Sequence, residues 1–177
     1  MVIVIHQTAN TQNAFDYNEK KVAEGVATYF DSANTLMTNP FLFDQNHRLK
    51  ILHDIEKLAP RAKNKCLHIS VNPSKSDGLI LGDQTIRLEI RQMMEHTGYG
   101  NQPYFVYKHK DLDRVHFHVV STRIDSVTGK KINTHDVYQF NADDRQVFKQ
   151  VMQELKNCFS VLQKYADTID QSWLGRV

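Results

Sequence analysis

The sequence has little of several features that would place it in a special class of protein. Its 177 residues include only two cysteines, Cys66 and Cys158, with neither a CxxC pair nor a zinc-ribbon spacing. Such cysteine usage favours a reducing cytoplasm over a disulfide framework. No run of about 18 apolar residues occurs, so no membrane insertion is expected. The N-terminus also lacks the basic start and long apolar stretch of a signal peptide.

A strong charge of one sign is also missing. Lys and Arg number 22 against 20 Asp and Glu, a net charge of +2, and such a balance says little about partners. The distribution is more informative, because residues 47–75 carry seven basic side chains against two acidic ones, a local net charge of +5. With 24% charged and 41% hydrophobic residues, the composition is typical of a globular chain, and we expect one domain over residues 1–177.

The alternation and spacing of apolar residues predict the elements of an α/β (α+β) fold. Period-two patterns predict strands over residues 1–6, 66–71, 104–109 and 115–123, and residues 27–30 fit another. Helical spacing predicts helices over 14–24, from Asp44 to Pro60, from Asp83 to Gly98 with Asp83 as the cap, and from Asn141 onward. Residues 7–13 are expected to be a loop. The short polar loop 110–114 indicates a hairpin, so we predict a mainly antiparallel central sheet with helices packed on it.

Three of the nine histidines, His109, His116 and His118, fall within ten residues. On a strand, His116 and His118 share one face, and His109 ends the partner strand across the loop, so the three imidazoles should meet at the mouth of the hairpin. Three such ligands can hold a divalent metal and leave coordination positions open. The alternative is that some of them are only exposed polar side chains. Asp111 and Asp113 in the loop could fix a ligand tautomer, or could be simple turn residues.

The segment from His109 to Val120 looks like the third motif of conjugative and mobilisation relaxases, a branch of the endonucleases named for a His-hydrophobic-His pair. The segment from Phe15 to Val22 resembles the first motif of that family, which contains a nucleophilic tyrosine, and residues 68–73 are similar to its second motif. The resemblance covers nearly the whole chain in order and spacing. It implies a ferredoxin-like relaxase palm, as the N-terminal nicking domain of what could be a longer protein.

The resemblance also implies a reaction and a set of site residues. His109, His116 and His118 would hold a divalent metal at the scissile phosphate, either Mn²⁺ or Mg²⁺, and Zn²⁺ or Ni²⁺ could occupy the same ligands in a crystal. Tyr17 would attack, displace a 3′ hydroxyl and leave a 5′ phosphotyrosine, a bond from which the strand can be rejoined. Asp111 would orient a ligand histidine or assist proton transfer. Tyr29 is a second N-terminal tyrosine, and only the motif favours Tyr17.

The expected substrate is single-stranded or hairpin DNA at a transfer origin, nicked in a site- and strand-specific way. Candidate DNA contacts come from basic and strand-end polar side chains: Lys20, Lys21, Ser70, Asn72 and Arg123. We expect a monomer that works with accessory mobilisation proteins. One alternative is a rolling-circle replication initiator or transposase nuclease of the same superfamily, although the tyrosine N-terminal to the histidines favours a relaxase. Another is a non-catalytic nucleic-acid-binding module stabilised by zinc.

Overall fold

The computed structural model describes residues 2–6, 10–35, 44–74 and 82–132. In this part the chain forms five strands and three helices: β1 (Val2–His6), α1 (Thr11–Ala23), β2 (Ala27–Ala33), α2 (Gln45–Glu56), β3 (Cys66–Asn72), α4 (Asp83–His96), β4 (Tyr104–His109) and β5 (His116–Thr122). None of these helices is long and apolar enough to cross a membrane. The chain divides into two compact units, 1–133 and 134–177. The helix predicted from Asn141 belongs to the second unit, outside the described residues.

The five strands form one antiparallel sheet in the order β1-β3-β5-β4-β2. Strands β4 and β5 pair as the predicted hairpin, with His109 opposite His116. The outer strands are β1 and β2, and β2 extends beyond the predicted residues 27–30 because a register shift between Tyr29 and Asp31 lets pairing continue to Ala33. The predicted α+β fold with an antiparallel sheet is therefore confirmed.

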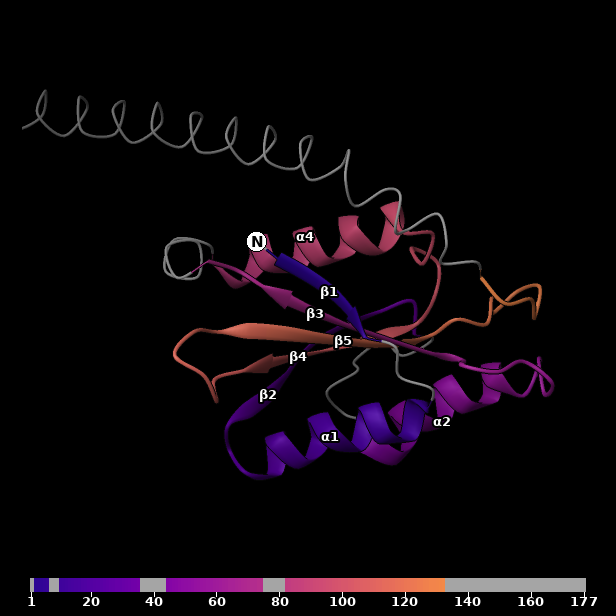
Figure 1. Cartoon of the computed structure of the whole chain (residues 1–177), viewed down its shortest axis with the longest axis horizontal. Coiled ribbons are helices and arrows are strands. Elements are labelled where there is room, and N and C mark those ends of the chain that lie inside the picture. Colours follow the sequence, from indigo (N-terminus) through magenta and orange to yellow (C-terminus); the bar gives the residue numbers. More distant parts are fainter. Residues whose placement is uncertain (1, 7–9, 36–43, 75–81, 133–177) are drawn as a thin grey trace, which may run out of the picture. The chain divides into compact units, whose positions relative to one another are not determined.

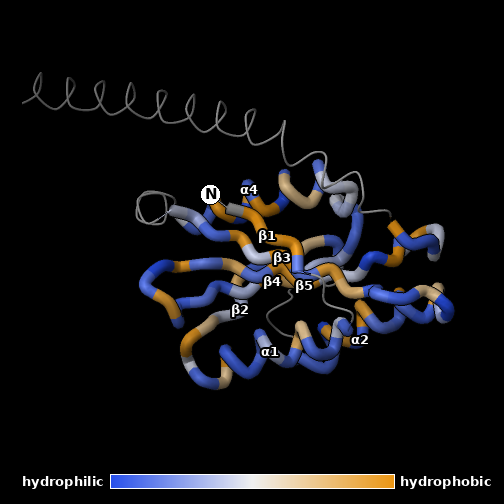
Figure 2. The backbone as a smooth tube through the Cα atoms, in the orientation of Figure 1, coloured by the Kyte–Doolittle hydropathy of each residue, from blue (hydrophilic) through white to orange (hydrophobic). Residues whose placement is uncertain are grey.

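The helices cover both faces of the sheet. Helices α1 and α2 lie on one side and α4 on the other (Figure 1). Because side chains alternate along a strand, Leu67, Ile69 and Val71 of β3 join the core under α4, whereas Cys66 of the same strand packs with Phe15 of α1. Figure 2 shows the hydrophobic colour concentrated toward the central strands and mostly hydrophilic residues along α1. The sheet face under α1 is therefore where polar side chains can gather.

Helix α1 begins three residues before its predicted start. Asn10 is the N-cap, and its side chain accepts a hydrogen bond from the backbone N–H of Asn13. The polar residues 11–13, predicted to be loop, therefore form the first turn. The predicted end at Gly25 is close to the observed one, because that glycine has φ 74° directly after the Glu24 cap.

The predicted capping role of Asp83 is wrong. Gly82 occupies the N-cap position of α4 and Asp83 lies in the first turn. The Asp83 carboxylate instead accepts a hydrogen bond from Lys108 Nζ at 2.6 Å. This carboxylate still lies in the first turn, where an acidic side chain complements the positive end of the helix dipole.

A buried ion pair holds α1 against α2 and the sheet. Glu19 of α1 accepts hydrogen bonds from Arg48 Nη2 of α2 at 2.6 Å and from the hydroxyl of Tyr107 on β4 at 2.5 Å. The side chains of Arg48 and Glu19 are 9% and 10% exposed. Burial together with the Glu19 carboxylate raises the pKa of Tyr107, so its hydroxyl stays protonated and donates. One turn of α1 is thereby fixed to two other elements.

Candidate active site

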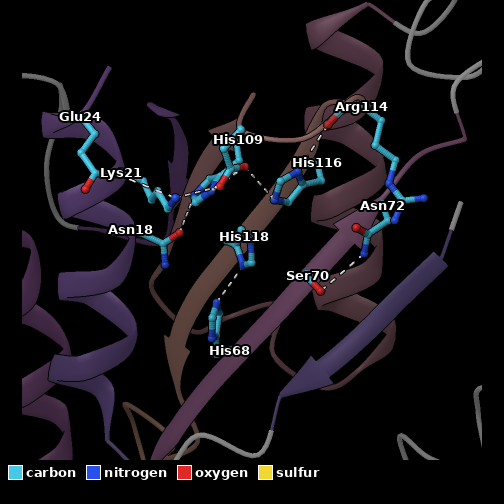
Figure 3. A network of polar contacts seen from close by, with 11 residues as sticks. Asn18, Lys21, Glu24, His68, Ser70, Asn72, His109, Arg114, His116 and His118 are labelled. Carbon is cyan, nitrogen blue, oxygen red and sulfur yellow. Dashed lines mark hydrogen bonds and ion pairs between the residues drawn. The ribbon is translucent and has the colours of Figure 1, made fainter. Parts of the chain in front are cut away.

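The hairpin brings three imidazoles together on the α1 face of the sheet. His109 ends β4, and His116 and His118 lie two residues apart on β5, with all three rings buried. One ring nitrogen from each lies within 4.8 Å of the others. The centroids of the His109 and His118 rings are 4.4 Å apart. Figure 3 shows the three rings gathered where the two strands meet, which is the convergence that the spacing predicts.

Two of the three imidazoles, those of His109 and His118, are held in the neutral form that binds metals. Burial and the neighbouring histidines lower the pKa of His118 to about 2. Burial, with His116 beside it, lowers the pKa of His109 to about 4. A neutral imidazole has one nitrogen lone pair to offer, so at neutral pH both rings are ready to act as ligands without first losing a proton.

A fourth histidine touches the trio from the neighbouring strand. His68 of β3 lies with Nε2 2.9 Å from Nδ1 of His118, and its ring also stacks near His6 of β1, with centroids 4.7 Å apart. Sequence reasoning placed His68 within a motif but gave it no role. The signal was its period-two position on a strand, since His68, Ser70 and the β5 histidines share one face once β3 and β5 pair.

Tyr17 projects from α1 beside the imidazoles. Its ring centroid lies 5.9 Å from that of His109 and 5.8 Å from that of His118. The side chain is 44% exposed, so part of it can be reached from solvent. Tyr29 is placed differently: it lies on the outer strand β2, its ring packs 5.9 Å from Tyr107, and burial raises its pKa. The structure thus brings Tyr17 to the histidines.

Asp111 lies in the β4–β5 loop between the imidazoles and α1. Its Oδ2 pairs with Lys21 Nζ at 3.1 Å, and its Oδ1 lies 3.6 Å from His116 Nε2 and 3.9 Å from His109 Nδ1. Burial opposes ionisation of this carboxyl, but the hydrogen bond from Lys21, a backbone hydrogen bond and the charge of Lys21 together outweigh it and hold its pKa below the ordinary range. Asp111 therefore presents a negative charge to the two rings. Asp113 is exposed.

The candidate DNA-contacting residues divide into two groups. Ser70 lies opposite His118 in the β3–β5 register, and Asn72, further along the same face, lies with Nδ2 3.5 Å from Ser70 Oγ. Lys20 is on α1 with a side chain 76% exposed. Arg123 follows the last residue of β5, at the opposite end of that strand from His116. Four of the five, including Lys21, thus lie on the elements that border the histidines, and Arg123 does not.

Two buried polar atoms at this site lack a hydrogen-bond partner among the described residues, and both suit a cation. His109 Nδ1 and Asp111 Oδ1 are both buried without a hydrogen-bond partner among the described residues, and such groups are costly to leave unsatisfied. Asp111 Oδ1 lies 3.9 Å from His109 Nδ1 and 3.6 Å from His116 Nε2. Three imidazoles with an adjacent carboxylate are a donor set for a divalent transition metal, so the residues present fit such an ion.

The fold and the site together define a class. An antiparallel sheet with helices on both faces gathers imidazole ligands on one face, beside an exposed tyrosine from a packed helix. This is a candidate metal centre with an exposed phenol beside it.

Comparison with known proteins identifies the family. The family described as "Relaxase: MobA/VirD2-like, nuclease domain" matches residues 17–159, and the chain therefore belongs to it. In fold, the chain is similar to the MobM relaxase domain (MOBV; Mob_Pre), whose Mn-bound crystal structure at pH 4.6 holds a 22-nucleotide strand of plasmid pMV158 oriT DNA. The two share 15% identity over 81% of this chain and 83% of that chain, with a TM-score of 0.50. Among curated proteins, no match is found.

Proposed function

We propose that this chain is a DNA relaxase that nicks and rejoins single-stranded DNA at a transfer origin through a covalent bond to Tyr17. One observation carries the proposal: the exposed Tyr17 ring lies within 6 Å of two imidazoles of a buried trio suited to a metal. Membership of a relaxase nuclease family supports the reaction class. The MobM domain, which shares the fold, is bound to oriT DNA and Mn, and this supports the substrate and the metal.

In this proposal His109, His116 and His118 hold one divalent ion, Mn²⁺ or Mg²⁺. When bound, such an ion draws charge from the non-bridging oxygens of a phosphate and makes phosphorus easier to attack. The low pKa values of His109 and His118 keep these ligands unprotonated across the physiological range. The negative charge of Asp111 beside His109 and His116 adds to the attraction for a cation.

Tyr17 is the nucleophile in the proposed reaction. Its phenolic oxygen forms a bond to phosphorus, the bond from phosphorus to the 3′ oxygen of the upstream strand breaks, and that oxygen leaves as a 3′ hydroxyl after taking up a proton. One phosphodiester replaces another, so the reverse attack by a 3′ hydroxyl rejoins the strand. Tyr29 is set aside because it lies on β2 against Tyr107 rather than beside the imidazoles.

The remaining side chains are assigned either to the electrostatics of the metal site or to binding of the DNA strand. Asp111 orients the ligand rings rather than carrying the proton, because its lowered pKa makes it a weak base. Lys21 holds Asp111 in place through their 3.1 Å contact. Lys20 is assigned a contact with the backbone phosphates of the DNA. Ser70 and Asn72 contact the strand where it crosses β3. Arg123 is assigned a phosphate contact away from the histidines.

A strand-transfer assay tests this function. Single-stranded oligonucleotides covering candidate transfer origins, labelled at the 3′ end, are incubated with the protein and Mn²⁺ and separated under denaturing conditions. A 5′ phosphotyrosine leaves the label on the protein, whereas label at the 5′ end should appear on a shorter free strand. Tyr17→Phe should abolish the adduct and Tyr29→Phe should retain it. An adduct that survives in Tyr17→Phe, or label on the protein only from the 5′ end, would contradict the proposal.

A second experiment separates the relaxase from a zinc-stabilised binding module. Hydrophobic clusters pack on both faces of the sheet, so in this proposal the fold stands without a metal. The double variant with His116→Ala and His118→Ala should lose metal binding and adduct formation while its circular dichroism spectrum stays native. Unfolding of the wild-type protein by a chelator would instead favour the alternative of a binding module stabilised by zinc.

A further inference from the structure

Asn18, the residue after Tyr17, is fully buried and contacts one of the three imidazoles. Its Oδ1 lies 2.8 Å from Nε2 of His109, and its side chain has no exposed surface. The contact joins α1 to β4 across 91 residues of sequence. Figure 3 shows Asn18 beside the His109 ring, on the side away from His116. A polar side chain buried so deeply in a helix needs hydrogen-bond partners. Here the partners also determine which way the Asn18 amide points.

The orientation of the Asn18 amide follows from its second contact. Its Nδ2 donates to the backbone carbonyl of Ala14 at 2.7 Å, one turn earlier in α1. A carbonyl oxygen can only accept, so the amide nitrogen must face Ala14 and Oδ1 must face His109. Because Oδ1 is also only an acceptor, the proton between Asn18 and His109 belongs to Nε2 of the imidazole.

This hydrogen bond fixes which nitrogen of His109 carries a lone pair. A neutral imidazole has one N–H and one lone pair, so an N–H at Nε2 leaves the lone pair at Nδ1. That atom is buried without a hydrogen-bond partner among the described residues. It lies 3.9 Å from Asp111 Oδ1, the same oxygen that lies 3.6 Å from Nε2 of His116.

We propose that Asn18 is a positioning residue for the metal site: it holds His109 in the Nε2–H tautomer and turns Nδ1 toward the ion. The inference rests on the proposed function, in which His109 is a ligand, and deepens it by naming the ligand atom. Because Asn18 follows Tyr17 directly in α1, the same bond sets the spacing between the attacking phenol and the metal site. Partners that orient a ligand histidine affect metal affinity by about 10–100-fold.

The tautomer can be measured without metal or DNA. A two-bond ¹H–¹⁵N NMR spectrum of the metal-free protein at pH 7.5 distinguishes the protonated from the unprotonated nitrogen of each imidazole, and His109→Gln assigns the His109 signals. We expect His109 to carry its proton on Nε2. A proton on Nδ1, or fast exchange between the two forms, would overturn the proposal, whatever the nuclease assay shows.

Metal affinity is the second measurement that tests the role of Asn18. Titration calorimetry with Mn²⁺ should give a Kd about 10–100-fold weaker for Asn18→Leu, which keeps the side-chain size but removes the acceptor. Asn18→Asp retains an acceptor and should restore the affinity. Thr11→Val is the matched control, because Thr11 is also buried on α1 but bonds to Glu56 rather than to a histidine, and this variant should bind Mn²⁺ as the wild type does.

The outcomes separate this inference from the proposed function. Unchanged Mn²⁺ affinity in a folded Asn18→Leu, or equal losses in the Leu and Asp variants, would contradict a positioning role. If Asn18→Leu does not fold, judged by circular dichroism, the NMR result on the wild-type protein and the Asn18→Asp affinity still decide. A protein that shows the expected tautomer and affinities but forms no Tyr17 adduct would overturn the function and leave the role of Asn18 intact.

Discussion

Removal of Arg48 should destabilise the protein far more than removal of an exposed basic residue from the same helix. Arg48 Nη2 and the Glu19 carboxylate are 2.6 Å apart and nearly buried. At an effective dielectric constant of about 20, their attraction is roughly 6 kcal/mol, and desolvation of the two ions offsets part of it. Among the described residues, Arg48→Met leaves the buried Glu19 carboxylate with the Tyr107 hydroxyl as its remaining hydrogen-bond donor, so we expect a loss of about 3–5 kcal/mol in the free energy of unfolding.

Urea unfolding followed by circular dichroism measures this loss. Lys50→Met is the matched control, because Lys50 also lies on α2 and pairs with Asp54 at 2.5 Å, but its side chain is 69% exposed. Such a pair contributes about 0–1 kcal/mol. Adding Glu19→Gln to Arg48→Met removes the stranded charge and should recover part of the loss. If Arg48→Met costs no more than Lys50→Met, the buried pair does not hold α1 in place.

Three further predictions concern protonation, metal and thiol reactivity. The pKa values of His109 and His118, about 4 and about 2 against the ordinary 6.5, mean that the unfolded chain binds more protons below pH 6.5. The melting temperature of the metal-free protein should therefore be highest above that pH and fall as the pH is lowered toward 4; a flat profile would contradict the burial of these rings. Mn²⁺ at about 100 times its Kd should stabilise the wild-type protein by roughly 2.7 kcal/mol and leave His116→Ala unaffected in denaturant titrations. Burial raises the pKa of the Cys66 thiol to about 11, so at pH 8 Cys66 should resist maleimide labelling until urea unfolds the chain, as mass spectrometry would show.

Local pattern in the sequence was sufficient for the hairpin and for the face on which its histidines lie. Period-two alternation alone puts His116 and His118 on one side of β5, and the short loop brings His109 opposite His116. The start of α1 was predicted less well. Asn10 caps α1 from within a run of Thr, Asn and Gln in which several residues could equally serve as caps, so nothing local singles it out.

The contacts that complete the site depend on strand order, which local pattern does not determine. His68 meets His118 only because β3 pairs with β5, although these strands are separated by α4 and β4 along the chain. Asn18 meets His109 across 91 residues, and its position on an amphipathic helix indicates no partner. The spacing of the histidines indicated the three candidate ligands, the family resemblance indicated the tyrosine, and Asp111 was already expected to orient a ligand. The contact of Asn18 with His109 emerged only from the packing of α1 on the sheet.

The alternation of β5 also constrains how this chain can evolve. Odd-numbered residues of that strand, Phe117 and Val119, belong to the core beneath α4, while the even-numbered His116 and His118 face α1. A one-residue insertion or deletion within β5 would exchange the two sets. It would place apolar side chains on the face toward α1 and imidazoles in the hydrophobic core beneath α4. Loss of reactivity and loss of folding would then come from the same genetic event. Length changes should therefore be tolerated in the 110–114 loop or after Thr122 far more readily than in the seven residues of β5.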